Sequence, residues 1–164
     1  MEKVNKYKEI ISEYQDMIYR LFCSYVGNID IRKDLFQNIL IRIWKGLNSF
    51  ENRSSISTWV YRISVNTSID FLRREDNNKN IGIDDIEIID KSKNVENDLI
   101  LSEKTKLMYK CISKLVFVDK TIITLYLEDL SYREISEIVG ISEKNVSVKL
   151  ARIKKKLNNC LKDY

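Results

Sequence analysis

The chain has 164 residues, 44% of them apolar, and a net charge of +4 at pH 7, which suits one ordinary soluble domain or two small ones. It has no histidine and no glycine-rich phosphate loop, which excludes Ser-His-Asp triads, Cys-His dyads, histidine-based zinc sites and P-loop chemistry. The charged N terminus is unlike a signal peptide and no apolar run approaches the roughly 20 residues of a membrane span, so a cytoplasmic protein without membrane insertion is expected.

A first helical domain is predicted for residues 1–75. Apolar residues recur there at helical spacing, and Asp30 is a plausible N-cap for the second helix. The three helices are expected at 5–26, about 30–47 and about 56–74, with a polar loop at 48–55. The pattern predicts a compact three-helix unit.

Residues 76–98 differ from both flanks. They are rich in Asn and Asp and contain 7 acidic but only 3 basic residues, which predicts an acidic flexible linker. A second helical domain is expected at 99–164, with helices at about 99–115 and 119–127 before a helix-turn-helix. The fold class predicted is therefore all-α, with two small helical domains joined by the linker.

The helix-turn-helix is the most specific local pattern, at about 131–157. Ser131 and Glu134 have the spacing of a capping box, and Gly140 is suited to the left-handed turn that ends the first short helix. Ser142 can cap the second helix, whose inward face is an apolar stripe from Val146 to Leu157. An ordinary helical hairpin is the alternative interpretation.

The outward face of that second helix is basic. Between Lys144 and Lys162 there are seven basic residues and no acidic one, and small side chains among them would let the helix enter a major groove. A solvated helix face is the alternative for such a charge run. The residues expected at DNA are Lys144, Asn145, Ser147, Val148, Lys149, Ala151, Arg152 and Lys155.

Two further motifs precede the helix-turn-helix. Asp34-Leu35-Phe36-Gln37 is followed by Trp44, and Ser57-Thr58-Trp59-Val60-Tyr61-Arg62 continues to Asn66. With the helix-turn-helix, in this order and over almost the whole chain, the sequence resembles the extracytoplasmic-function group of bacterial RNA polymerase sigma factors. The resemblance implies a non-catalytic initiation subunit that reads the −35 and −10 promoter elements and starts promoter melting.

The resemblance also implies partners. Core RNA polymerase would bind through the clamp helices of its largest subunit and the flap of its second-largest subunit, and an anti-sigma factor would hold the protein inactive. The residues that would dock on the clamp helices are Asp34, Gln37, Asn38 and Ile41. The alternative interpretation of these residues is a solvated helix face. The helix-turn-helix would read the −35 element, and the acidic linker would lie in the RNA exit path, with plain disorder as its alternative. No small-molecule substrate, cofactor or metal is expected.

For the −10 element, the resemblance implies a loop that captures a flipped base and a helix that helps to melt the duplex. Core packing is an alternative for Trp59 and Tyr61, at least as well supported for Trp59, and solvation is the alternative for the arginines. The residues implied are Phe50, Glu51, Asn52, Arg53, Ser54, Ser55, Trp59, Tyr61, Arg62, Asn66, Arg73 and Arg74.

The sequence departs from the family pattern at a few positions. Val116 follows Leu115 where the family usually has Leu-Pro, Asn52 replaces a common glycine, and Ser147 and Val148 stand where basic residues are frequent. These departures bear on the promoter sequence rather than on the class of protein. The three cysteines lie far apart in the sequence, so thiols without a structural disulfide are expected.

Two other functions are open at this point. A conventional helix-turn-helix repressor or activator, usually dimeric on a palindrome, would need only the C-terminal motif. Against it stand Asp34, Gln37 and the block from Trp59 to Asn66, which such a regulator does not use. A small enzyme using carboxylates or a cysteine is disfavoured by the missing histidine and glycine loop.

Overall fold

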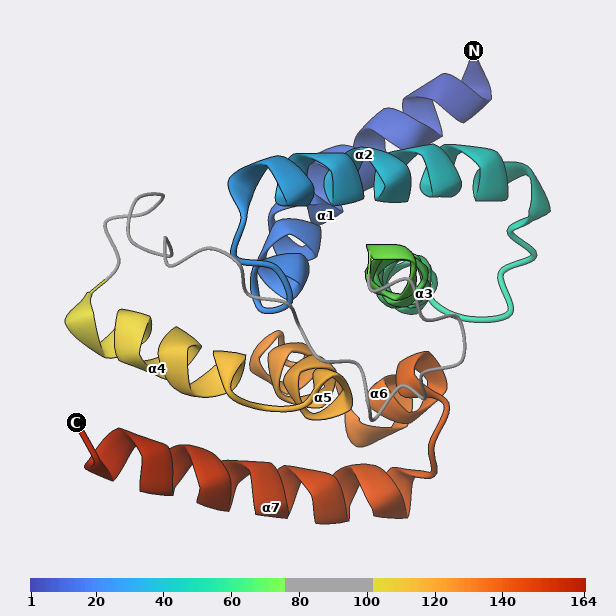
Figure 1. Cartoon of the computed structure of the whole chain (residues 1–164). Coiled ribbons are helices and arrows are strands. Elements are labelled where there is room, and N and C mark those ends of the chain that lie inside the picture. The colour runs from blue at the N-terminus through green and yellow to red at the C-terminus, as the bar shows by residue number, and fades with distance from the viewer. Residues whose placement is uncertain (76–101) are drawn as a thin grey trace.

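The computed structural model of the chain describes residues 1–75 and 102–164, and within these ranges it is helical with no strand. This confirms the all-α prediction, whereas the predicted linker at 76–98 lies outside the described residues. The elements, labelled in Figure 1, are α1 (Glu2–Cys23), α2 (Ile29–Gly46), the short 3-10 helix η1 (Leu47–Ser49), α3 (Ile56–Glu75), α4 (Glu103–Ser113), α5 (Phe117–Leu127), α6 (Tyr132–Val139) and α7 (Glu143–Lys162).

The start of α2 corrects one prediction. Asn28, not Asp30, is the N-cap, because the Asn28 side-chain oxygen accepts hydrogen bonds from the backbone N–H groups of Asp30 at 2.9 Å and Ile31 at 3.2 Å. Asp30 instead lies in the first turn of the helix, where a carboxylate interacts favourably with the helix dipole. Asn and Asp are both good caps and these two lie only two positions apart, so the sequence pattern alone indicated the wrong one.

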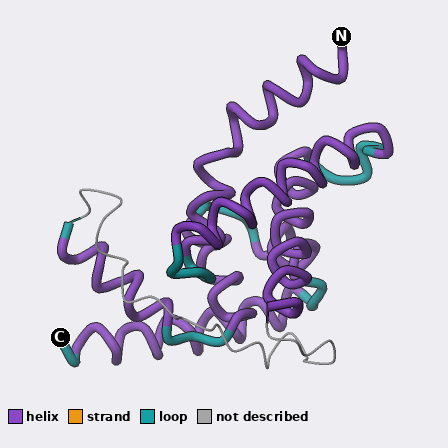
Figure 2. The backbone as a smooth tube through the Cα atoms, turned by 45° about the horizontal axis from the view of Figure 1, so that its top comes forward, coloured by secondary structure: helices purple, strands orange, loops and turns teal. Residues whose placement is uncertain are grey.

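Helices α1, α2 and α3 pack on one another and form the N-terminal half of the molecule (Figure 1). In the C-terminal half, α7 packs across α4, α5 and α6. Figure 2 shows from a second direction that the described parts of the chain consist of helices joined by loops. Most of these helices bury one apolar face, whereas α5 is buried on all sides from Phe117 to Leu125. The fully buried residues include Ile18, Phe22, Leu35, Ile39 and Ile43 in the first half and Ile122, Leu125, Ile135, Val146 and Ile153 in the second.

The two halves are not separate bodies, because their buried apolar residues form one continuous core. Helix α3 packs against α6 and α1 packs against α5. At this junction the rings of Tyr25 and Phe117 are stacked with centroids 4.4 Å apart, and the Tyr25 hydroxyl lies 2.5 Å from the hydroxyl of Thr121. The sequence predicted two helical units but did not predict this contact between them.

The expectation that no structural disulfide forms is wrong. Cys111 on α4 and Cys160 on α7 are joined by a disulfide, with Cα atoms 5.9 Å apart and a separation of 49 positions in the sequence. The packing of α4 on α7 brings these cysteines together, and spacing along the chain carries no signal of that proximity. The bond fixes the C-terminal end of α7 to α4.

Within the described ranges we looked for membrane-spanning helices and for clusters of metal-ligating side chains. None of the helices there combines the length and the apolar character that a membrane-spanning helix needs. Side chains of the metal-ligating types do not cluster there in a group able to hold an ion.

Candidate nucleic-acid interface

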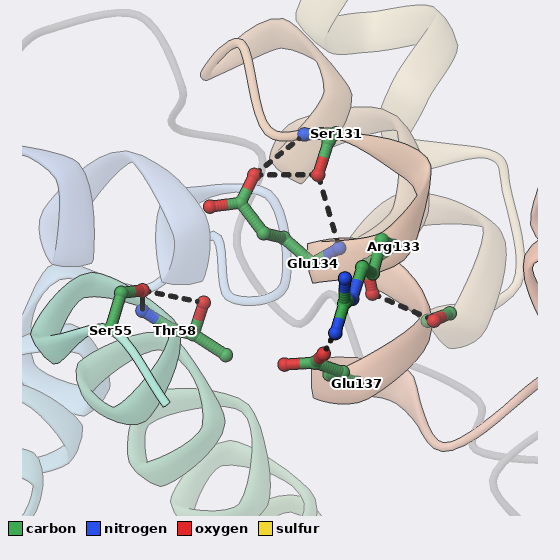
Figure 3. Close-up of polar contacts among 7 residues, drawn as sticks. Ser55, Thr58, Ser131, Arg133, Glu134 and Glu137 are labelled. Carbon is green, nitrogen blue, oxygen red and sulfur yellow. Dashed lines mark hydrogen bonds and ion pairs between the residues drawn. The ribbon is translucent and has the colours of Figure 1, made fainter. Parts of the chain in front are cut away.

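The helix-turn-helix formed by α6 and α7 has the caps and the turn that the sequence predicted. The Ser131 hydroxyl accepts from the backbone N–H of Glu134 at 3.2 Å, and the Glu134 carboxylate accepts from the backbone N–H of Ser131 at 2.8 Å, which completes the capping box (Figure 3). Gly140 ends α6 with φ of +80°, a left-handed conformation that favours glycine. Ser142 then caps α7 through the backbone N–H of Asn145 at 3.2 Å.

Helix α7 has one buried face and one exposed face. The four predicted inward residues, Val146, Leu150, Ile153 and Leu157, are all buried. Seven of the eight residues expected at DNA are exposed, and the eighth, Lys149, is half-buried. The opposite face of α7 is therefore free of packing along its whole length and presents mainly basic and small side chains.

The basic residues of α7 divide into two groups. Lys149 and Lys156 both pair with the buried carboxylate of Asp119, with N–O distances of 3.6 Å and 3.2 Å, and Lys154 donates to the Tyr126 hydroxyl at 3.0 Å. This hydrogen bond raises the pKa of Lys154. These three lysines help to hold α7 on α5, a role that the sequence pattern did not separate from DNA contact.

The second group has no partner among the residues that the structure describes, and the same holds for Lys162 at the C-terminal end of α7. Lys144, Arg152 and Lys155 are exposed, and none makes an ion pair or hydrogen bond with the described part of the chain. They lie on α7 at spacings of eight and three residues, which places them on neighbouring parts of one face. Their charges are therefore available to an external anion such as a phosphate.

The loop before α3 is built around two aromatic rings. Phe50 and Trp59 lie with ring centroids 4.9 Å apart, and a Cβ atom at Gly46 would lie only 3.0 Å from the Trp59 ring. Trp59 is thus partly buried against α2, in line with the core alternative. Asn52 has φ of +53°, so the residue that replaces the family's glycine adopts a left-handed conformation that Asn tolerates better than most residues.

The polar residues of this loop mostly face solvent. Glu51, Asn52, Arg53 and Ser55 are exposed and Ser54 is half-buried. Arg53 and Glu51 form an ion pair at 2.5 Å. The Ser55 hydroxyl accepts from the backbone N–H of Thr58 at 3.1 Å (Figure 3), so Ser55 stabilises the first turn of α3. The loop backbone and side chains remain accessible around this anchor.

The residues of α3 that were predicted to contact the −10 element differ in their exposure to solvent. Asn66 and Arg74 are exposed, and Arg62 and Arg73 are half-buried. The Nε atoms of Arg62 and Arg73 are buried and have no hydrogen-bond partner in the described part of the chain. The expectation that Tyr61 faces DNA does not hold in this conformation, because its side chain is only 3% exposed.

Burial of Tyr61 follows from the packing of α3 on α6. Loss of solvation raises the pKa of the Tyr61 hydroxyl well above its usual value, and the carboxylates of Glu128 and Glu134 raise it further. Both carboxylates belong to the C-terminal half. Tyr61 therefore lies at the junction of the two halves, where it is shielded by a contact distant in sequence.

The predicted docking residues form an exposed face on α2. Asp34, Gln37, Asn38 and Ile41 are all exposed, and the Ile41 side chain is 50% exposed although it is apolar. Trp44 extends this face by one turn with 37% exposure, with the Lys3 ammonium 4.3 Å from its ring centroid. Trp44 belongs to the motif already noted, but its spacing did not show that it would be accessible.

Comparison with known protein families identifies both halves. Residues 10–78 match the family model for sigma-70 region 2, and residues 105–157 match the model for sigma-70 region 4. The chain is 32% identical to the ECF RNA polymerase sigma-E factor of Haemophilus influenzae, with 92% of this chain and 84% of the relative covered. It is also 32% identical to the RNA polymerase sigma factor SigV of Bacillus subtilis, over 87% and 82% of the two chains.

Solved structures share the fold. The sigma factor RpoE of Bartonella quintana, in complex with the anti-sigma factor NepR, superposes with a TM-score of 0.74 and 20% identity, covering 94% of this chain and 98% of that one. CnrH, in complex with the cytosolic domain of CnrY, gives a TM-score of 0.68 and 17% identity over 96% and 88%. With both family regions in order and a relative matched along most of its length, the chain belongs to the extracytoplasmic-function group of RNA polymerase sigma factors, the promoter-specific initiation factors.

Proposed function

We propose that this sigma factor directs core RNA polymerase by reading two promoter sites with two separate surfaces. The −35 element would contact the outward face of α7, and the −10 element would contact the loop at 50–55 and α3. The observation that carries this proposal is the exposed basic face of α7, with three cations that have no partner in the described protein. Sigma factors are initiation subunits, so the polymerase supplies the chemistry.

At the −35 element, α7 would lie in the major groove. Arg152 is the residue best suited to a bidentate contact with guanine, because its guanidinium is exposed and has no partner in the described part of the chain. Lys144 and Lys155 would meet phosphates on either side and fix the register of the helix. Lys149 contributes less directly, since its ammonium is already paired with Asp119.

At the −10 element, the loop at 50–55 would receive a base flipped out of the non-template strand. Its exposed polar side chains can meet the Watson–Crick edge of an unpaired base, and Asn66 on the exposed side of α3 has both a donor and an acceptor for this contact. Trp59 would act by positioning Phe50 rather than by stacking on DNA, because its ring is packed on Gly46 and Phe50. Arg74 is exposed and suits a phosphate.

Contact between Tyr61 and melted DNA would require a change in the arrangement of the two halves. In the present conformation α6 packs against α3 and Tyr61 is shielded. We infer that α6 moves away from α3 when the polymerase places the two halves on separate promoter sites. Tyr61 would become available to DNA only in that open state.

The exposed face of α2 is the proposed site for the clamp helices of the polymerase's largest subunit. The exposed apolar residues of this face, Ile41 and Trp44, follow the polar residues Asp34, Gln37 and Asn38 along the helix, and protein interfaces combine apolar and polar groups in this way. The C-terminal half would bind the flap of the second-largest subunit. An anti-sigma factor is the proposed regulator, as in the complex of RpoE with the anti-sigma factor NepR.

The experiment is promoter-dependent transcription in a purified system. Core RNA polymerase from a related bacterium is assembled with and without this protein, and run-off transcripts are mapped on a library of genomic fragments. We expect transcripts that start at a shared pair of elements only when the protein is present. Absence of both core binding and promoter-dependent transcripts would exclude the proposed function, and binding to palindromic duplex without polymerase would favour a conventional regulator.

A further inference from the structure

The middle of the recognition face of α7 is apolar. Val148 lies two residues beyond Val146 and two before Leu150, both buried, so on a helix its side chain points almost directly away from the core. It is 42% exposed and does not belong to the apolar residues packed against the core. The fold therefore does not use this side chain.

The neighbours of Val148 on the helix surface show what kind of ligand it faces. Lys144 precedes it by one turn and Arg152 follows it by one turn, and both are exposed cations without a partner in the described chain. Ala151, also exposed, lies three residues on and is too small to cover the valine. A polyanion that binds these cations would also contact the apolar side chain of Val148.

The major groove offers few partners for an apolar side chain. Its edges present hydrogen-bond donors and acceptors at every base pair, and the one apolar group among them is the C5-methyl of thymine. A β-branched valine has restricted side-chain rotation, so it presents a rigid apolar surface at fixed depth. The small side chains of Ser147 and Ala151 beside it let the helix approach closely enough for van der Waals contact.

We propose that Val148 contacts a thymine methyl group and makes thymine the preferred base at one position of the −35 element of this sigma factor. This inference rests on the proposed function, and it names the base chemistry that the −35 surface reads. Removing one methyl from an apolar contact weakens binding by about fourfold, from the roughly 0.8 kcal/mol that accompanies burial of one methyl-sized group. Arg152 and the lysines supply the remaining affinity.

The test uses the holoenzyme of core polymerase and the full chain. A −35 element is first selected from duplexes randomised at that site, and each thymine in it is then replaced singly by uracil, which removes only the C5-methyl. Competition binding measures the affinity of each duplex. For the wild-type protein we expect an affinity loss of about fourfold at one thymine and little change at the others.

Variants then assign the effect to the residue. With Val148→Ala, uracil and thymine should bind equally well at that position. The matched control is Val116→Ala, a valine of similar exposure at the N-cap of α5, which should keep the full uracil penalty. Circular dichroism melts should show both variants folded, as expected for changes at exposed side chains.

The remaining outcomes separate this inference from the function on which it rests. A selected −35 element without thymine, or a uracil penalty that persists in Val148→Ala, would overturn the role of Val148 while leaving −35 recognition in place. Failure of the wild-type holoenzyme to select any −35 element would instead contradict the proposed function itself.

Discussion

Arg20 on α1 and Glu128 at the end of α5 form a bidentate ion pair, with Nε–Oε1 and Nη2–Oε2 distances of 2.5 Å and 2.9 Å. The pair links residues 108 positions apart and connects the N-terminal half to the C-terminal half. The same junction contains Tyr25 stacked on Phe117 and the buried Tyr61. Together these contacts hold the protein in an arrangement in which α6 covers part of α3.

The first prediction concerns the strength of this ion pair. The Arg20 side chain is 46% exposed and that of Glu128 is 17% exposed, so water screens the charges and the coupling should be about 0.5–1 kcal/mol. Urea unfolding of Arg20→Ala, Glu128→Ala and the double variant measures this coupling. A matched cycle on Lys33 and Asp30, a largely exposed pair at 3.9 Å, should give a value near zero. Equal coupling energies in both cycles would contradict a stabilising role for the Arg20–Glu128 ion pair.

The second prediction is a loss of stability at alkaline pH. Burial raises the pKa of Tyr25 and of Tyr61, and it raises the pKa of Tyr14 to about 12. In the unfolded chain these hydroxyls ionise near pH 10. Their contribution is therefore complete below about pH 10 and is lost as the pH rises toward the folded-state values, by up to about 1.4 kcal/mol per pH unit for the buried Tyr25 and Tyr61. Tyr14 contributes less, because solvent screens its half-buried side chain.

The variant Tyr25→Phe tests whether the buried Tyr25 hydroxyl causes part of this alkaline loss of stability. Thr121 already donates its hydroxyl proton to the Phe117 carbonyl at 2.9 Å, so the Tyr25 hydroxyl is the donor to Thr121. The variant should lose about 1 kcal/mol at neutral pH for this hydrogen bond and should show a shallower decline between pH 10 and pH 12. Tyr132→Phe, at an exposed ring, should decline as steeply as the wild type. A decline in Tyr25→Phe as steep as in the wild type would be inconsistent with the assignment.

The third prediction concerns the disulfide. Closing a loop between Cys111 and Cys160, which lie 49 positions apart in the sequence, restricts the unfolded chain, and reduction should lower the free energy of unfolding by about 2–4 kcal/mol. Guanidinium titrations with and without dithiothreitol measure the difference. Cys111→Ala with Cys160→Ala should remove the effect of the reductant, whereas Cys23→Ala should retain it. Wild-type stability that is indifferent to dithiothreitol would count against the bond.

What the sequence could predict was set by the range of each interaction. Ser131, Glu134 and Gly140 act within one helical turn, so their residue types alone predicted the capping box and the left-handed turn. The disulfide of Cys111 and the shielding of Tyr61 depend on packing between elements far apart in the chain, and no local pattern carries that information. Within α7, charge alone could not distinguish Lys149, held by Asp119, from the unpartnered Lys144.

The fourth prediction separates melting from polymerase binding. Asn66 is exposed on α3 and contributes nothing to the core, so Asn66→Ala should fold and bind core polymerase as the wild type does. It should lose promoter opening, because an amide that reads an unpaired base is removed. Permanganate footprinting of unpaired thymines measures opening, and co-purification measures core binding. Opening at the wild-type level, or loss of core binding, would contradict the proposed role.

The fifth prediction concerns base selection by α7. Arg152 has no partner in the described chain, so its replacement by alanine should leave folding intact, since no hydrogen bond or ion pair is broken. If its guanidinium pairs with guanine, Arg152→Ala should weaken the preferred −35 element by about 1–3 kcal/mol and leave other sequences nearly unchanged. Lys162→Ala, at the C-terminal end of the same helix, should weaken all sequences equally or not at all. Holoenzyme binding to the preferred duplex and to single base-pair variants measures both effects. A uniform loss across all duplexes for Arg152→Ala would show that this residue contacts phosphate only, because a phosphate is the same at every sequence whereas the guanine edge is not.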